Sequence, residues 1–186
     1  GLLGFDFAHG RLDVSSHPFC GGVPTDVRIT TRYNEQEFVS SLMGIVHETG
    51  HARYEQGLPR QLLGQPVAEA RSMGIHESQS LFCEMQLGHD TAFLALLAPR
   101  IRAHFGEQAA FAPANLAKLY NRVDPGFIRV DADEVTYPAH VILRYELERD
   151  LIEGHIEVAD LPELWDAKMQ QWLGLSTQGN YQNGCM

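Results

Sequence analysis

The most informative short stretch of the sequence is "IVHETGH", residues 45–51, in which two histidines stand four positions apart. Residues with this spacing lie on the same face of an α-helix, so His47 and His51 can direct two imidazoles at one ion. Imidazole nitrogen is a good zinc ligand. Glu48 is turned about 100° from His47, where its carboxylate can reach a metal-bound water. The spacing predicts a hydrolytic metal site, and a surface helix with two solvated histidines is the alternative.

A third protein ligand is expected from another helix, because catalytic zinc sites use three protein ligands and leave a fourth position open for water. The stretch "GIHESQS", residues 74–80, offers His76 and Glu77, which face different directions because they are adjacent. Glu77 would complete a His, His, Glu set. Glu69 and Glu84 are alternatives, since they fall on the same predicted helix.

The elements that position these residues follow from the apolar periodicity. Alternating apolar and polar residues predict a small antiparallel β-sheet in residues 1–33, with "CGGVP" as a turn. Residues 34–186 read as helical, and Asn34 with Glu37 can cap the helix that carries the histidines. That helix should end near Gly57. Further helices are expected at 66–88, after Asp90 through "FLALLAPRIRAHF" with a kink or a break at Pro99, at "PANLAKLYNRV", at "DEVTYPAHVILRYELERDLIEG" and from Asp160 through "ELWDAKMQQWLG".

Composition excludes several classes of protein. The net charge of -10 argues against binding to nucleic acid or to anionic membranes, whose phosphates favour basic surfaces. The sequence contains neither 18 consecutive apolar residues nor a signal peptide pattern. Three widely spaced cysteines form neither a disulfide framework nor a cysteine zinc knuckle, so a reducing cytoplasm is expected. The fold class expected is mainly α, in one compact segment over 1–186, and both ends suggest a piece of a longer chain.

Five motifs strengthen the metal hypothesis, because they occur together and in a fixed order. They are "HPF" at 17–19, "DVRIT" at 26–30, "HETGH" at 47–51, "HESQ" at 76–79 and "IRVDAD" at 128–133. In this order the sequence resembles the carboxypeptidase Taq family of thermostable metallocarboxypeptidases. The resemblance implies a largely helical metallopeptidase core with a deep groove, one zinc or cobalt ion at its floor, and a homodimer. It also implies release of single residues from peptide C-termini.

The resemblance assigns roles to the central residues. Transferred by motif, His47, His51 and Glu77 are the metal ligands and Glu48 is the catalytic base, which favours Glu77 over the two other glutamates. The family pattern has further helices before and after the region matched here. The resemblance therefore implies that residues 1–186 form the central catalytic segment of a longer protein.

A carboxypeptidase must also bind a free C-terminal carboxylate, which a guanidinium does best through two parallel hydrogen bonds. Arg129 is the first candidate and Arg28 the second, with an ordinary ion pair to a nearby Asp as the alternative for each. His17 can contact the substrate near this carboxylate, or be a turn residue without such a role. Asp133 and Asp26 can orient the ligand histidines through their second nitrogen, and Asp133 can equally cap a helix.

The function predicted is metal-dependent removal of C-terminal residues from peptides, with Glu48 as general base. Two other functions are compatible with the same motifs. One is a zinc endopeptidase of the oligopeptidase type, and the other is a metal-binding fragment without activity.

Overall fold

The structure, a computed structural model, describes residues 1–183, so Cys185 lies outside the described part. The chain divides into two compact units, Gly1–Ala117 and Lys118–Met186, each with a hydrophobic core of its own. Over the described residues, no helix combines the length and the apolar character needed to cross a bilayer.

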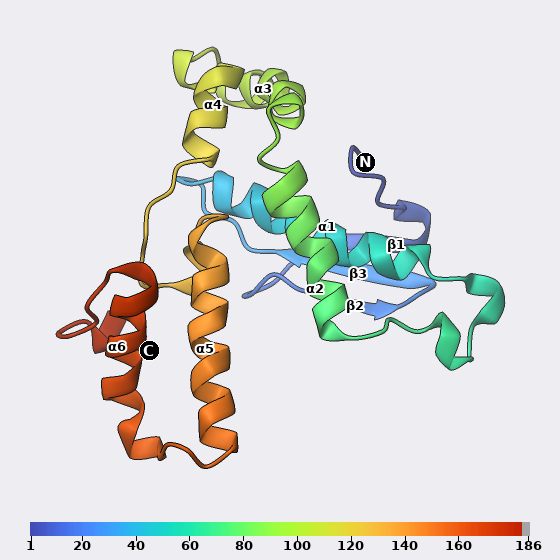
Figure 1. The fold of residues 1–186 in the computed structure, drawn as a ribbon. Helices are drawn as coiled ribbons and strands as arrows, with labels where there is room; N and C mark the ends of the chain where they lie inside the picture. Colours follow the sequence, from blue (N-terminus) through green and yellow to red (C-terminus); the bar gives the residue numbers. More distant parts are fainter. Residues whose placement is uncertain (184–186) are drawn as a thin grey trace. The chain divides into compact units, whose positions relative to one another are not determined.

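The predicted fold class, mainly α with a small sheet near the N-terminus, is confirmed (Figure 1). The strands within residues 1–183 are β1 (Gly10–Val14), β2 (Cys20–Val23) and β3 (Asp26–Thr31). The α-helices in the same range are α1 (Val39–Gly57), α2 (Met73–Leu81), α3 (Thr91–Phe105), α4 (Pro113–Tyr120), α5 (Thr136–Ile152) and α6 (Leu161–Leu173).

The sheet is mixed, so the expectation of purely antiparallel pairing was wrong for β1. Its strand order is β1-β3-β2, with β1 parallel and β2 antiparallel to β3. The chain reverses after β1 and again after β2, and β3 then runs in the direction of β1. Strand β3 lies at the centre of the sheet. Most of its side chains are buried, whereas those of β1 and β2 are not.

The second strand also corrects the interpretation of "CGGVP" as a turn, because Cys20–Val23 pairs with β3. Gly22 has a φ of +98°, and a Cβ on it would lie 2.2 Å from the carbonyl oxygen of Asp26. A glycine is therefore required where the two backbones approach. Two adjacent glycines usually indicate a turn. Here Gly22 instead allows β2 to pair closely with β3.

Helix α1 packs against β3 and β2, and it carries the histidine motif across the sheet. The core between them consists of Phe5, Val27, Ile29 and Ala52, each less than a tenth exposed. Burying such side chains stabilises the unit by roughly 1.5–3 kcal/mol each for the larger ones. This core fixes the rotation of α1 about its axis and hence the direction of its polar face.

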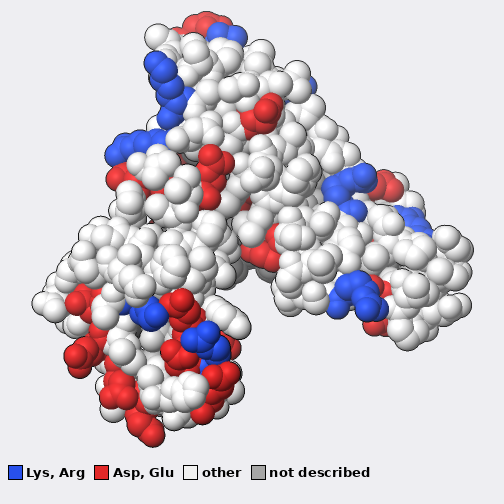
Figure 2. Space-filling view, in the orientation of Figure 1, with Lys and Arg blue, Asp and Glu red and all other residues white. Residues whose placement is uncertain are grey.

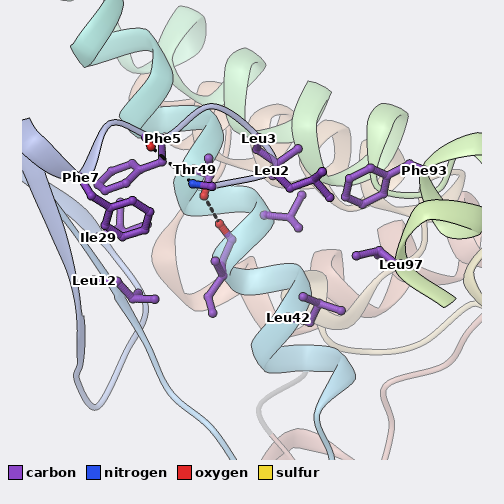
Figure 3. A pocket seen from close by; sticks show the side chains of 13 residues that line it. Leu2, Leu3, Phe5, Phe7, Leu12, Ile29, Leu42, Thr49, Phe93 and Leu97 are labelled. Atoms are coloured by element: carbon purple, nitrogen blue, oxygen red, sulfur yellow. Dashed lines mark hydrogen bonds between the residues drawn. The ribbon is translucent and has the colours of Figure 1, made fainter. Parts of the chain in front are cut away.

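The apolar face of α1 lines a cavity of about 170 Å³, seen from close by in Figure 3. Leu42, Ile45, Val46 and Thr49 reach it at the three- and four-residue spacing of one helix face. The Thr49 hydroxyl donates to the carbonyl oxygen of Ile45 at 2.6 Å, so its polar atom is satisfied within the helix. The two histidines of the motif lie outside this lining.

Two predicted helix boundaries need correction. The motif helix begins at Val39 and not after Asn34, whose side chain accepts from the backbone N–H of Gln36 in a turn. The carboxylate of Glu37 instead accepts from the N–H of Ser40 in the first turn of α1. The helix predicted at 66–88 is divided: a short 3-10 turn precedes α2, which Ser72 caps, and a π-helix at Phe82–Leu87 follows it. The helix around Pro99 is continuous.

The second unit is built on α5 and α6, which pack together. Leu143, Met169 and Leu173 form its core, with Trp165 partly buried against them. Figure 2 shows that Asp and Glu side chains gather over this pair of helices, so the negative charge of the chain is prominent there.

Candidate metal centre

The polar face of α1 presents His47 and His51 together, as their four-residue spacing predicts. Their ring centroids are 5.1 Å apart with an interplanar angle of 75°. Both side chains are largely buried, at 21% and 11% exposure. Imidazoles that are shielded from water and held by a packed helix lose little conformational entropy when they bind an ion.

Glu77 reaches the histidines because α1 and α2 approach closely at Gly50. A Cβ on Gly50 would lie 2.5 Å from the carbonyl oxygen of Gln79 and 2.6 Å from the Cα of Ser80. The fully buried Ser80 lies one helical turn from Glu77 and donates from its hydroxyl to Glu77 Oε2 at 3.1 Å. The crossing of two backbones at a glycine therefore sets where this carboxylate lies.

The three side chains present a donor set that suits a zinc-like ion. Glu77 Oε2 lies 3.2 Å from His51 Nε2 and 3.7 Å from His47 Nε2. All three ligand atoms lie within 4.8 Å of one another. Ligands of a tetrahedral zinc ion are roughly 3.3 Å apart, given bond lengths of about 2.0–2.1 Å. The observed separations are close to this value, so the residues fit a divalent ion.

The second nitrogen of each ring is occupied by another side chain. His47 Nδ1 lies 2.7 Å from Glu84 Oε2, and His51 Nδ1 lies 2.7 Å from His76 Nδ1. Both rings therefore turn Nε2 toward Glu77 and Nδ1 away from it. Glu84 sits in the π-helix at Phe82–Leu87. π-Helical turns are often found at functional sites, where they re-aim side chains.

Glu48 is buried on α1, with 6% of its surface exposed. Burial raises the pKa of Glu48, while the neighbouring charges of His47 and His51 oppose the rise. A carboxyl group with a raised pKa is a better proton acceptor than an ordinary surface glutamate once it is ionised. Glu48 is therefore the candidate general base of this site.

The carboxylate of Glu77 has the opposite tendency. The hydrogen bond with His51 lowers the pKa of Glu77 to about 2, although burial works against this. Glu77 thus remains ionised at any ordinary pH, as a metal ligand must. Two glutamates of one site are tuned in opposite directions by their neighbours.

Electrostatics at His47 reflect its carboxylate neighbours. Burial alone would lower the pKa of His47, but the hydrogen bond and charge of Glu84, with Glu77 and Glu48, raise it overall. The same carboxylates that raise the pKa of His47 would also favour a divalent cation at this position.

Three further candidate site residues, His17, Arg28 and Asp26, lie in the first unit. His17 lies near enough to Glu48 for its charge to act on that carboxyl group. Arg28 points outward from β3 and pairs with Asp26, with Nη2 and Oδ2 2.7 Å apart. Asp26 therefore holds Arg28 and not a ligand histidine, since Glu84 and His76 occupy the two Nδ1 atoms.

The other two predicted residues belong to the second unit. Arg129 donates from Nη1 to the hydroxyl of Tyr137 at 2.9 Å, and its guanidinium lies 5.6 Å from the centroid of that ring. Asp133 accepts from the backbone N–H groups of Val135 and Thr136, and so caps α5. Of the two roles considered for Asp133, helix capping is the one its hydrogen bonds describe.

Sequence reasoning missed the roles of three residues. Glu84 and His76 were considered as metal ligands and not as partners of the ligand rings, and Gly50 was not considered. The role of Glu84 could have been inferred from its spacing. Glu84 follows Glu77 by seven residues, nearly two helical turns, so both side chains lie on one helix face. The role of Gly50 had no such signal, because it depends on the crossing of two helices.

Comparison with known proteins identifies the family. The family model described as carboxypeptidase Taq (M32) metallopeptidase matches residues 1–186. Carboxypeptidase 1 of Bacillus subtilis is 43% identical over 180 residues, which is 95% of this chain. Thermostable carboxypeptidase 1 of Thermus thermophilus is 43% identical over 184 residues, or 98%. The chain spans 36% of the length of each of these relatives.

Solved structures give the same result. Trypanosoma cruzi metallocarboxypeptidase 1 superposes with a TM-score of 0.92 and 57% identity, covering 96% of this chain and 36% of that one. The M32 carboxypeptidase from Deinococcus radiodurans R1 gives a TM-score of 0.87 and 43% identity, covering 93% of this chain and 35% of its own. The chain described here belongs to the carboxypeptidase Taq (M32) metallopeptidase family.

Proposed function

We propose that this protein is a metal-dependent carboxypeptidase that removes residues from the free C-termini of peptides. The observation that carries the proposal is the convergence of His47 Nε2, His51 Nε2 and a Glu77 oxygen within 4.8 Å, beside the buried Glu48. Membership of the M32 family supports the carboxypeptidase reaction over other metal-dependent hydrolyses.

The placement of the side chains supports the catalytic roles that we propose. A divalent ion held by His47, His51 and Glu77 would acidify a water molecule and polarise the scissile carbonyl group. Glu48 accepts the proton of the attacking water and delivers it to the leaving amine. Its raised pKa suits both steps, because it must gain and lose a proton in each cycle.

Recognition of the substrate carboxylate is assigned to Arg129. Its side chain donates to the neutral hydroxyl of Tyr137, whereas Arg28 is already paired with the carboxylate of Asp26. A guanidinium whose partner is neutral keeps its charge available for an anion. His17, whose charge acts on Glu48, is the second candidate for a substrate contact.

The test compares Glu48→Gln with the parent protein. We expect the variant to keep its metal content and to lose turnover by about 10²–10⁴-fold, the usual contribution of a general base. The control is Glu35→Gln, because Glu35 is an exposed glutamate outside the metal centre and should change neither property. Metal content is measured by elemental analysis and turnover with a short peptide. A Glu48→Gln protein with parental turnover would exclude Glu48 as the base.

A second measurement separates exopeptidase from endopeptidase activity. Peptides of one sequence are compared with a free and with an amidated C-terminus. A carboxypeptidase should release single residues from the free acid alone, because the amide removes the charge that the arginine binds. Equal cleavage of both would indicate an endopeptidase, and a parent protein that binds metal without cleaving either would be inactive. The identity of the ion, zinc or cobalt, stays a prediction. The homodimer and the cytoplasmic location stay predictions as well.

A further inference from the structure

The structure contains a chain of hydrogen-bonding side chains that leads away from the candidate metal centre. His51 Nδ1 lies 2.7 Å from His76 Nδ1, and His76 Nε2 lies 2.7 Å from Glu55 Oε1. His51 and Glu55 belong to α1, whereas His76 belongs to α2. We call the side chains of His51, His76 and Glu55 the relay.

The relay admits one arrangement of protons when Nε2 of His51 faces an ion. A metal ligand nitrogen needs its lone pair, so a neutral His51 carries its proton on Nδ1. That N–H donates to His76 Nδ1, which must then be the acceptor, so the one N–H of a neutral His76 is on Nε2. The Nε2–H of His76 donates to the carboxylate of Glu55, which only accepts when ionised.

Packing holds the middle of the relay in place. The rings of His51 and His76 have centroids 4.8 Å apart, and Tyr54 meets the His76 ring edge-on at 5.1 Å. The side chains of His76 and Glu55 are 14% and 24% exposed, so water competes little with their hydrogen bond.

A small cavity of about 80 Å³ lies beside this end of the relay, lined in part by Cys20. Burial raises the pKa of Cys20 to about 12, so the thiol stays neutral there.

We propose that His76 and Glu55 are positioning residues of the metal centre, which hold His51 as the Nδ1–H tautomer with Nε2 directed at the ion. The inference rests on the proposed function, because it presupposes that His51 binds a metal. His76 is thereby distinguished from Glu77, its neighbour in sequence, whose carboxylate lies 3.2 Å from Nε2 of His51. Partners of this kind fix the orientation of a ligand histidine and raise its affinity for metal.

The test measures the dissociation constant of Zn²⁺ by competition with a chromophoric chelator, in the full chain. His76→Leu removes the acceptor for His51 and should weaken binding about 10–100-fold. His76→Asn restores an acceptor oxygen near the position of Nδ1 and should recover most of that loss. A merely structural role predicts the reverse order, because leucine fills an apolar space better than asparagine does. Glu55→Gln keeps an acceptor and should lose only a few-fold.

Controls separate this inference from the proposed function. His9 lies 2.7 Å from Asp6 in a half-exposed pair outside the metal centre, so His9→Leu should leave the Zn²⁺ affinity unchanged. His51→Ala should abolish tight binding. If the parent binds Zn²⁺ through His51 while His76→Leu binds equally well, the relay proposal fails and the metal site stands. A parent that binds no metal overturns both.

A measurement on the unaltered protein keeps the inference testable if the variants do not fold. In the Zn²⁺-loaded parent, ¹⁵N chemical shifts of the imidazoles should show a protonated Nδ1 on His51 and a protonated Nε2 on His76. A metal-bound Nδ1 on His51, or a protonated Nδ1 on His76, would overturn the relay.

Discussion

At the scale of single residues, the geometry of the candidate metal centre depends on which ring nitrogen of His47 and of His51 contacts each neighbouring side chain. The two ligand histidines turn Nε2 toward Glu77, and a different partner holds each Nδ1. For His47 the partner is an anionic carboxylate, whereas for His51 it is a second imidazole. The Glu84 carboxylate raises the pKa of His47, so the affinity of His47 for protons should govern how metal binding depends on pH.

We expect Zn²⁺ affinity to fall as the pH drops through the raised pKa of His47, so that the decline begins above pH 6.5. In Glu84→Gln the hydrogen bond and charge that contribute most to raising the pKa of His47 are lost, so burial, which lowers this pKa, has more weight. The decline should then begin at a lower pH, while affinity at pH 8 is weaker by about tenfold. Chelator competition between pH 5.5 and 8.5 measures both effects. Glu69→Gln is the control, since Glu69 is exposed, and an unchanged onset in Glu84→Gln would contradict the prediction.

The same pair makes a prediction for the metal-free protein. A raised pKa in the folded state means that the His47–Glu84 interaction stabilises the fold fully below pH 6.5. This contribution is lost as the pH rises through the folded-state pKa. The difference in thermal stability between parent and Glu84→Gln, both metal-free, should therefore be larger at pH 6 than at pH 8.5. A difference that grows with pH would contradict the assignment.

At the scale of elements, the decisive contact is the crossing of α1 and α2 at Gly50. Helical spacing alone predicts that His47 and His51 share a face, and it identifies the segment that supplies Glu77. It cannot predict Gly50 as the contact point, because the approach of two backbones depends on tertiary packing. The same limit explains why the roles of Glu84 and His76 were missed: sequence spacing shows which side chains share a face, and not which atom of a neighbouring helix they meet.

We expect Gly50→Ala to push the two helices apart, because its Cβ would lie 2.5 Å from a backbone oxygen that cannot move freely. The cost should be about 1–3 kcal/mol of unfolding free energy. Zn²⁺ affinity should fall as well, since the shift carries Glu77 away from the histidines.

The matched control is another glycine of α1. A Cβ on Gly44 would meet only a Pro18 ring atom at 3.7 Å, an ordinary contact. Gly44→Ala should therefore stabilise the helix by about 0.5–1 kcal/mol and leave metal binding unchanged. Denaturant unfolding and chelator competition measure both variants. Equal effects of the two substitutions would show that Gly50 has no special role.

At the scale of the whole molecule, the residues proposed to bind the metal and the residue proposed to bind the substrate carboxylate belong to different units of the chain. All three candidate ligands lie in Gly1–Ala117, whereas Arg129 lies in the unit that begins at Lys118. The single segment expected over 1–186 stays a prediction, because apolar periodicity identifies which helices must be buried and does not show which core each helix joins. Two cores without a shared member, around Ile29 and around Leu143, account for the two units.

This division predicts that the two cores affect different properties. Leu143→Ala removes a fully buried side chain and should destabilise its unit by about 2–5 kcal/mol, while Zn²⁺ affinity stays within twofold of the parent. Ile29→Ala loosens the packing beneath α1 and should lower stability and metal affinity together. Chelator competition measures the Zn²⁺ affinity of both variants, and denaturant unfolding measures their stability. If Leu143→Ala weakened Zn²⁺ binding as much as Ile29→Ala does, the two units would not be energetically independent.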